Sequence, residues 1–323
     1  MRRREFMLAL GGVAAWSIPV RAQRAKTPVR LGFLPLGSPD NKYDQSLVEA
    51  FRQGLGQVGL VEDRDIVLEV AWISGDPNQA VSDVLKRGAD LLITCGSSAS
   101  VAAKGQTSTI PIVFVSVGDP IAMGLAESLS RPSRNATGFS DMLADLSGKL
   151  VDLASSFQEA SIEYLWHTAW PDGQNRYQST EQAAQAVGVK LRSKGIADIN
   201  QLDGALSAAR NSGSRVVIVQ PSPFTYGQRR RIIASAMNNG LGTIYAFPVA
   251  AREGSLIAYG PDYTYMYRRA PIYVERILKG SNPADLPVEQ PTKIEFLVNL
   301  STAKALGIEV PLSLLIRADE LLE

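Results

Sequence analysis

Small polar side chains follow three short β-rich runs within the first 120 residues of the chain. Ser38, Ser97, Ser98 and Asp119 each lie just after such a run. In an open parallel sheet the carboxyl ends of the strands form the edge where ligands bind. These positions therefore predict a ligand site built from strand ends and the loops that follow them.

Ser97 and Ser98 stand between Gly96 and an apolar helical pattern that begins at Ala99. The free N–H groups at the start of a helix favour a carboxylate or a similar anion, and the two hydroxyl groups can add donors. The alternative is that one of the two serines only caps the helix. The pattern thus indicates either an anion site or a helix cap.

Asp119 also has two interpretations. Its carboxylate could hold an ammonium group, or it could cap a helix expected over residues 121–129 with Pro120 as the first residue. An anion-binding helix end that faces an ammonium acceptor would suit an α-amino acid.

The second half of the chain supplies aromatic and amide side chains near predicted strand ends. Isolated aromatic residues are more often part of a core than of a ligand wall, but several near loops favour a wall. The candidates for apolar contacts are Trp170, Phe224, Phe247 and Tyr259, and those for polar contacts are Gln220 and Ser222.

Catalysis finds little support in the sequence. Ser98, Asp119 and His167 occur in the chain order of an α/β-hydrolase triad, but the segment around Ser98 lacks the second glycine of a nucleophile elbow. The glycine patterns of nucleotide-binding loops are absent, and a single histidine excludes a His-rich metal site. Cys95 lies in an apolar run and indicates a buried structural thiol. We therefore expect a protein that is not an enzyme and uses no cofactor or metal.

Strands and helices must alternate to position these residues. The first unit has strands near residues 29–35, 66–72, 90–95, 112–117 and 135–139, and the pattern restarts at 162–166. Such alternation predicts an α/β fold with two Rossmann-like lobes, each with a parallel sheet. No Gly/Ser-rich or Pro-rich linker separates the units, so lobes that hinge on shared segments are expected.

The N-terminus indicates export. Residues 1–22 contain a basic Arg2-Arg3-Arg4 segment, a short apolar stretch and a Val20-Arg21-Ala22 cleavage pattern, as in a signal peptide. The arginines favour a twin-arginine signal, with an ordinary Sec signal as the alternative. No later apolar run reaches about 18 residues, so we expect a periplasmic protein without stable membrane insertion. A net charge of +1 argues against nucleic acid as a partner.

An ordered set of short motifs resembles a known family. These motifs are Phe51-Arg-Gln-Gly-Leu55, Val117-Gly-Asp-Pro120, Leu286-Pro-Val-Glu-Gln-Pro-Thr-Lys293, Ala303-Lys-Ala-Leu-Gly307 and Arg317-Ala-Asp-Glu320. Each is weak alone, but together they span nearly the whole chain. In this respect the sequence resembles the ABC transporter substrate-binding proteins related to the tryptophan and aromatic amino-acid binding group.

The resemblance implies a type I periplasmic-binding-protein fold, with two lobes, three crossovers and a ligand cleft between the lobes. The N-terminal lobe would comprise residues 28–147 plus about 259–285, and the C-terminal lobe residues 148–258 plus about 286–323. The implied ligand contacts lie at Ser38, Ser97, Ser98, Asp119 and Ser140, and in the loops after Trp166, after Val219 and near Phe247.

Two segments depart from the family pattern on the ligand side. His167-Thr-Ala-Trp-Pro171 stands where the family usually has Asn-Pro-Ala-Asn-Pro, and Gln220-Pro221 stands where it often has Asp-Pro. These changes concern ligand identity more than the fold.

Together these observations predict a monomeric periplasmic component of an ABC importer. It would bind a small polar ligand, an amino acid with aromatic amino acids among the candidates, by closure of the cleft, and then meet a permease at the inner membrane. A periplasmic ligand-sensing module for a signalling receptor is the alternative, and a secreted serine hydrolase that uses Ser98 is the weaker one.

Overall fold

The computed structural model describes residues 27–143, 145–159, 161–170 and 172–323. The predicted signal peptide, residues 1–22, lies outside these residues. Within the described ranges, no helix combines the length and the apolar character that a membrane span requires.

The N-terminal lobe is built on a five-stranded sheet in the order β2-β1-β3-β4-β5, with every pair parallel. Its strands are β1 (Val29–Leu34), β2 (Ile66–Val70), β3 (Leu91–Cys95), β4 (Ile112–Val117) and β5 (Ala136–Ser140). The side chains of β3, β4 and β5 are buried throughout, because helices cover both faces of the sheet. These helices include α1 (Lys42–Gln57) on one face and α2 (Pro77–Lys86) and α3 (Ser97–Gln106) on the other.

The C-terminal lobe has a seven-stranded sheet in the order β12-β11-β10-β9-β8-β6-β7. Its strands are β6 (Ser161–His167), β7 (Lys190–Ile196), β8 (Val216–Val219), β9 (Gly242–Tyr245), β10 (Ile257–Pro261), β11 (Ile294–Asn299) and β12 (Glu320–Leu322). Its helices include α4 (Ser147–Ser155), α5 (Gly173–Ala186), α6 (Leu202–Asn211), α7 (Pro223–Gly227), α8 (Arg229–Asn238), α9 (Pro248–Arg252), α12 (Leu300–Leu306) and α13 (Leu312–Arg317). The predicted α/β fold with parallel sheets in two lobes is confirmed, except that β10 and β11 pair antiparallel.

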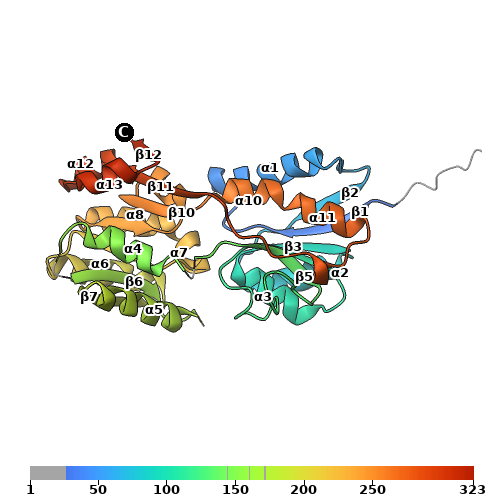
Figure 1. The fold of residues 1–323 in the computed structure, drawn as a ribbon, viewed down its shortest axis with the longest axis horizontal. Coiled ribbons are helices and arrows are strands. Elements are labelled where there is room, and N and C mark those ends of the chain that lie inside the picture. The colour runs from blue at the N-terminus through green and yellow to red at the C-terminus, as the bar shows by residue number, and fades with distance from the viewer. Residues whose placement is uncertain (1–26, 144, 160, 171) are drawn as a thin grey trace, which may run out of the picture.

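The chain passes between the two lobes more than once. Figure 1 shows the lobes side by side, with connecting segments of the chain between them. After β10, helices α10 (Tyr263–Arg269) and α11 (Pro271–Leu278) pack against α1 of the first lobe. The chain then runs along the edge of the first sheet, where Glu289 forms a parallel bridge with Phe139, before it enters β11. These shared segments connect the lobes as a hinge would.

One predicted helix is absent, and two pairs of observed helices are each separated by a single residue. The helix expected over 121–129 is wrong, because the segment forms turns and Gly124 adopts a left-handed φ of +66°. Helices α7 and α8 meet at Gln228, and Ala270 separates α10 from Pro271, which starts α11.

Candidate functional site

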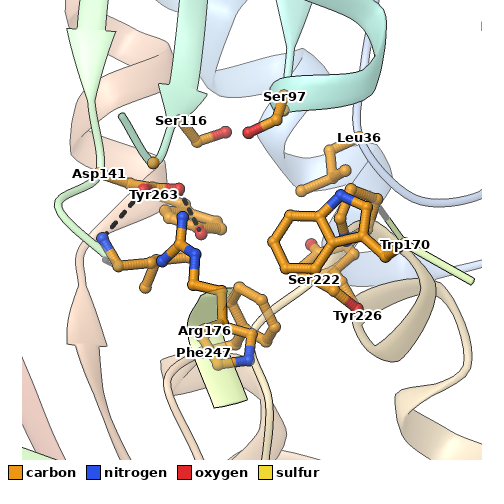
Figure 2. A pocket seen from close by; sticks show the side chains of 15 residues that line it. Leu36, Ser97, Ser116, Asp141, Trp170, Arg176, Ser222, Tyr226, Phe247 and Tyr263 are labelled. Atoms are coloured by element: carbon orange, nitrogen blue, oxygen red, sulfur yellow. Dashed lines mark hydrogen bonds between the residues drawn. The ribbon is translucent and has the colours of Figure 1, made fainter. Parts of the chain in front are cut away.

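A cavity lies between the two lobes, at the carboxyl ends of the strands, and we name it the inner pocket (Figure 2). Its volume is about 30 Å³ with the lobes in this arrangement. The first lobe contributes Leu36, Gly96, Ser97, Ser116, Gly118, Asp141 and Leu143. The second contributes Trp170, Arg176, Pro221, Ser222, Pro223, Tyr226 and Phe247, and α10 contributes Tyr263.

Asp141 follows β5 directly and places a buried carboxylate in the inner pocket. Its Oδ1 accepts the N–H of Leu143 at 3.1 Å, and its Oδ2 accepts the hydroxyl of Tyr263 at 3.2 Å. Burial raises the pKa of Asp141 to about 6, although the nearby Arg176 guanidinium acts in the opposite direction. At pH 7 this carboxylate is therefore still mostly ionised and can attract a cation.

Arg176 reaches the same pocket from the first turn of α5. Its Nε donates to Asp172 at 2.6 Å, and its guanidinium lies 5.6 Å from the ring centre of Trp170. Nη1 is buried and finds no acceptor among the described residues. A Cβ atom at Gly118 would lie 2.6 Å from Nη2, so glycine leaves the guanidinium the space it occupies. Arg176 thus offers an N–H group that a ligand anion could satisfy.

Ser116 points into the pocket because β4 is irregular there. The pairing register between β4 and β5 shifts between Phe114 and Val117, and Ser116 has a φ of +54°. Bulges of this kind turn a side chain away from its normal direction and are frequent next to functional sites. The Ser116 Oγ is buried without a hydrogen-bond partner among the described residues, so it is a second group left for a ligand.

The start of α3 faces the interlobe cleft. Gly96 is the residue that precedes the helix, with a φ of +79°, and no side chain caps it. The interpretation of Ser97 or Ser98 as a helix cap is therefore wrong. Ser97 lines the inner pocket, whereas Ser98 lines the wider space outside it. The first N–H groups of α3 add a positive partial charge on this side.

Aromatic rings enclose the remaining sides of the inner pocket. Tyr226 and Phe247 meet edge to face with ring centres 5.0 Å apart, and Tyr263 lies 6.0 Å from Phe247. Trp170, which is half-buried, lies opposite on the loop after β6. The pocket therefore combines a few polar groups with an apolar wall, as ligand sites usually do.

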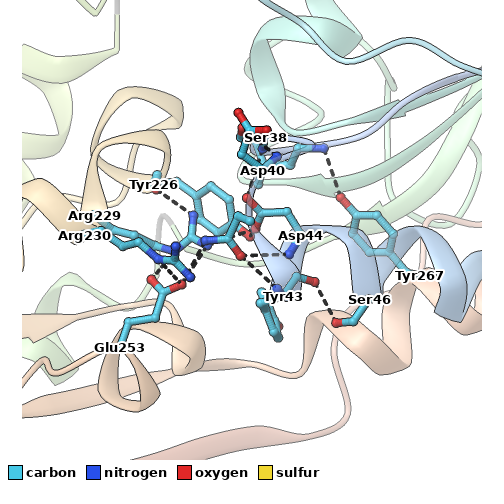
Figure 3. Close-up of polar contacts among 12 residues, drawn as sticks. Ser38, Asp40, Tyr43, Asp44, Ser46, Tyr226, Arg229, Arg230, Glu253 and Tyr267 are labelled. Carbon is cyan, nitrogen blue, oxygen red and sulfur yellow. Dashed lines mark hydrogen bonds and ion pairs between the residues drawn. The ribbon is translucent and has the colours of Figure 1, made fainter.

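Tyr226 also belongs to a polar cluster that joins the lobes behind the pocket (Figure 3). Its hydroxyl donates to Asp44 Oδ1 at 2.8 Å, and Asn41 donates to Glu253 at 3.0 Å. Asn41 and Asp44 come from the first lobe, and Tyr226, Arg229 and Glu253 from the second. We call these five residues the interlobe cluster.

Four predicted contact residues lie outside the inner pocket and form internal hydrogen bonds. The Oδ1 of Asp119 accepts the N–H groups of Ile121 and Ala122 at 3.0 and 2.9 Å, which is the local capping role in a turn. The Oγ of Ser38 accepts the N–H of Asp40 at 3.2 Å.

The other two of the four, Ser140 and Gln220, are buried. Ser140 donates to the Gly118 carbonyl at 3.3 Å, and Gln220 donates to the Gly173 carbonyl at 2.9 Å. Gln220 also accepts the His167 N–H at 3.4 Å, so it holds the loop after β6 in place.

The structure brings the other candidates to the cleft. Ser97, Trp170, Ser222 and Phe247 line the inner pocket, and Ser98 and Phe224 line the space beside it. The Ser222 hydroxyl is engaged in the capping box at the start of α7. Tyr259 instead packs on Phe296 in the second lobe.

Sequence reasoning missed Asp141, Arg176, Ser116, Tyr226 and Tyr263. Asp141 is one residue beyond the candidate Ser140. The predicted strand ends at residue 139, whereas β5 ends at Ser140, so the first residue after the observed strand is Asp141. Arg176 was missed because α5 starts with the polar run Gly173-Gln-Asn-Arg176, which has no apolar helical periodicity.

The proposed hydrolase triad is not assembled. Ser98 and His167 line the same space, but the Asp119 carboxylate lies elsewhere and bonds to its own turn. The His167 ring stacks on Phe224, with ring centres 4.1 Å apart.

Relatives and solved structures agree with this architecture. A tyrosine-binding protein of Clostridioides difficile is 26% identical over 222 residues, which are 68% of this chain and 64% of that protein's length. A conserved domain protein of Vibrio cholerae superposes with a TM-score of 0.81 at 22% identity, over 91% of this chain and 100% of that one. An ABC domain in complex with L-Trp from Streptococcus pneumonia gives a TM-score of 0.81 at 19% identity, over 92% and 100%. These structures show the fold.

The family itself is shown by a sequence match that spans residues 44–322, to the family described as ABC transporter substrate binding protein. The predicted resemblance is thus confirmed over most of the chain. The chain belongs to the ABC transporter substrate-binding protein family.

Proposed function

We propose that the inner pocket binds the charged groups of a free α-amino acid, which the protein delivers to an ABC permease. The observation that carries the proposal is the convergence of opposite charges in one buried pocket. Asp141 supplies an anion, while Arg176 and Ser116 supply polar atoms without protein partners among the described residues. A zwitterion is the small solute that needs both kinds of partner.

The two charged groups of the ligand have distinct partners. The carboxylate would accept from Arg176 Nη1, from the Ser116 hydroxyl and from the start of α3 at Ser97. The ammonium group would donate to Asp141, which is mostly ionised at pH 7 because its pKa is about 6. The site would thus reject solutes that lack either group, since one buried charge would remain unpaired.

The relatives support an amino acid as the ligand. The tyrosine-binding protein and the complex with L-Trp are both named for aromatic amino acids. We further propose that the N-terminal segment directs export to the periplasm, and that the protein acts there as a monomer without catalysing a reaction. Capture would proceed by closure, and a ligand shifts the lobes only if it binds the closed arrangement more tightly than the open one.

Binding of matched ligands tests the assignment. We expect a ligand at 100 times its Kd to raise the free energy of unfolding by about 2.7 kcal/mol in a thermal-shift assay. Asp141→Asn should weaken phenylalanine far more than 3-phenylpropanoate, which lacks the amine. Arg176→Met should weaken phenylalanine far more than phenethylamine, which lacks the carboxylate. A screen in which no amino acid shifts the unfolding temperature, but another solute class does, would refute the proposal.

A further inference from the structure

Gln220 is completely buried behind the inner pocket and does not line it. It follows β8 directly, and hydrogen bonds fix its backbone on both sides. Its N–H donates to the Leu165 carbonyl at 2.9 Å, and its own carbonyl accepts the Thr225 hydroxyl at 2.5 Å. The Gln220 side chain therefore extends from a well-fixed point of the sheet.

The Gln220 amide joins the two ends of the loop between β6 and α5. Its Oε1 accepts the N–H of His167, the last residue of β6, at 3.4 Å. Its Nε2 donates to the carbonyl of Gly173, the first residue of α5, at 2.9 Å. A carboxylate of similar length could not donate to Gly173, and an aliphatic side chain could form neither bond. The amide is thus suited to hold both ends at once.

Glycine at position 173 allows these two ends to meet. A Cβ atom there would lie 2.5 Å from the His167 carbonyl oxygen, which is too close for any side chain without a backbone shift. Within the loop, Trp170 donates its N–H to His167 at 3.3 Å, and Gly173 donates its N–H to Trp170 at 2.8 Å. The loop is therefore closed by its own turns and by the Gln220 amide.

Helix α5 carries Arg176 one turn after this junction. The Arg176 side chain is 7% exposed, and its guanidinium lies 5.6 Å from the ring centre of Trp170 in the same loop. On the side of the first lobe it fits closely against Gly118, where a Cβ atom would lie 2.6 Å from Nη2. Since the first turn of a helix moves with its first residue, a displaced Gly173 would shift the guanidinium in the inner pocket.

We propose that Gln220 is a positioning residue for ligand recognition, which directs Arg176 toward the ligand carboxylate by holding both ends of the loop between β6 and α5. The inference rests on the proposed function, in which Arg176 binds that carboxylate. Gln220 itself does not contact the ligand in this arrangement. Its effect on binding passes through the start of α5.

A first test needs no ligand and follows the Nε–H group of Arg176 by NMR. Its signal is the arginine side-chain signal that is missing from Arg176→Met. Because this group donates to Asp172 at 2.6 Å and the side chain is nearly buried, its exchange with solvent should be slow. Gln220→Met keeps about the same side-chain length without the two hydrogen bonds, and should make the exchange at least about tenfold faster.

Ser255→Ala is the matched control for a general loss of stability. Ser255 is also completely buried in the second lobe, and its hydroxyl donates to the Thr243 carbonyl at 2.7 Å, but it does not line the inner pocket. The exchange of the Arg176 signal should be the same in this variant as in the wild type. Equal exchange rates in the wild type and in Gln220→Met would overturn the inference.

A second test uses the affinity ratio of phenylalanine to phenethylamine, which isolates the contribution of the ligand carboxylate. Calorimetric titration should show this ratio about tenfold lower in Gln220→Met, because the contact between Arg176 and the carboxylate is weakened. Ser255→Ala should leave the ratio unchanged. In the Arg176→Met background, adding Gln220→Met should lower the ratio by less than about twofold, because the intermediary is already absent.

The outcomes separate the positioning role from the proposed function. An unchanged ratio in Gln220→Met, or losses that multiply in the double variant, would show that Gln220 does not act through Arg176. If Gln220→Met fails to fold, Gln220→Glu gives the same tests, since it keeps the acceptor for His167 and loses only the donor to Gly173. If no amino acid binds the wild-type protein, the proposed function fails, and the exchange of the Arg176 signal still decides whether Gln220 positions this side chain.

Discussion

Arg229 of α8 and Asp44 of α1 form an ion pair across the two lobes, with 3.0 Å between Nη2 and Oδ1 and side chains that are 3% and 1% exposed. Arg229 also donates to Glu253 at 2.8 Å and lies over the Tyr226 ring, 4.4 Å from its centre. Burial raises the pKa of Asp44, and the Arg229 charge opposes that effect. The charge of each residue is therefore tolerated because the other is present.

Arg229→Met should lower the free energy of unfolding by about 3–5 kcal/mol, because it leaves the Asp44 carboxylate buried without its cation. Arg230→Met is the matched control, since Arg230 pairs with the same Glu253 but is 59% exposed. It should cost less than about 1 kcal/mol. Urea unfolding of both variants checks the difference, and equal losses would contradict a special role for the buried pair.

Ligand affinity should depend on pH through Asp141. Its pKa of about 6 means that the carboxylate is ionised above that value and gains a proton below it. Between pH 7 and pH 5, the affinity for an amino acid should therefore fall by about tenfold, as the ammonium group loses its partner. Titrations across this range measure the effect, with Asp141→Asn expected to bind weakly and without this pH dependence. An identical profile in that variant would assign the titration to another group.

Gly54 and Gly56 lie in the same helix but should respond oppositely to alanine. A Cβ atom at Gly54 would overlap the carbonyl oxygen of Arg268 in α10, whereas one at Gly56 would meet no atom within 4 Å. Gly54→Ala should destabilise by about 1–3 kcal/mol through the forced backbone shift. Gly56→Ala should stabilise by up to about 1 kcal/mol, because alanine favours the helix. Thermal unfolding of the two variants measures the difference. If both substitutions destabilised the protein, the cause would lie in the helix itself and not in the contact with the Arg268 carbonyl oxygen.

Asp119 should contribute to stability and not to binding. Asp119→Ala removes the acceptor for the N–H groups of Ile121 and Ala122 and should cost about 1 kcal/mol. Asp119→Asn keeps an acceptor oxygen and should cost less. Neither should change the amino-acid affinity by more than about twofold. If Asp119→Asn instead lowered the affinity for phenylalanine more than the affinity for 3-phenylpropanoate, Asp119 would contact the ammonium group of the ligand.

Most of the fold follows from local sequence patterns. Continuous apolar runs such as residues 112–115 favour strands that are covered on both faces, and alternation of such strands with helices favours parallel pairing. The antiparallel β11 departs from this because the chain returns from the first lobe to enter the sheet at its far side. That return is a property of the whole chain and leaves no local signal.

The site was less accessible to sequence reasoning. The candidates Ser97, Trp170 and Phe247 line the inner pocket, since strand ends and loops direct side chains there. Ser116 could not be foreseen, because its direction depends on a register shift between two strands. Gln220 and Ser140 lie at strand ends, where ligand contacts are expected. Their side chains instead donate hydrogen bonds to backbone carbonyl groups of neighbouring segments.

The interlobe cluster also bears on how a membrane permease could tell a loaded receptor from an empty one. Because Asp44 and Arg229 attract each other without any solute, part of the free energy that brings the lobes together is independent of cargo. A solute then has to supply only the remaining difference, which raises its apparent affinity. The same attraction between the lobes increases the population of closed molecules without a solute. These empty molecules would compete with loaded ones for the permease. A stronger ion pair would thus raise the apparent affinity for the solute, and it would also raise the frequency with which empty closed molecules bind the permease.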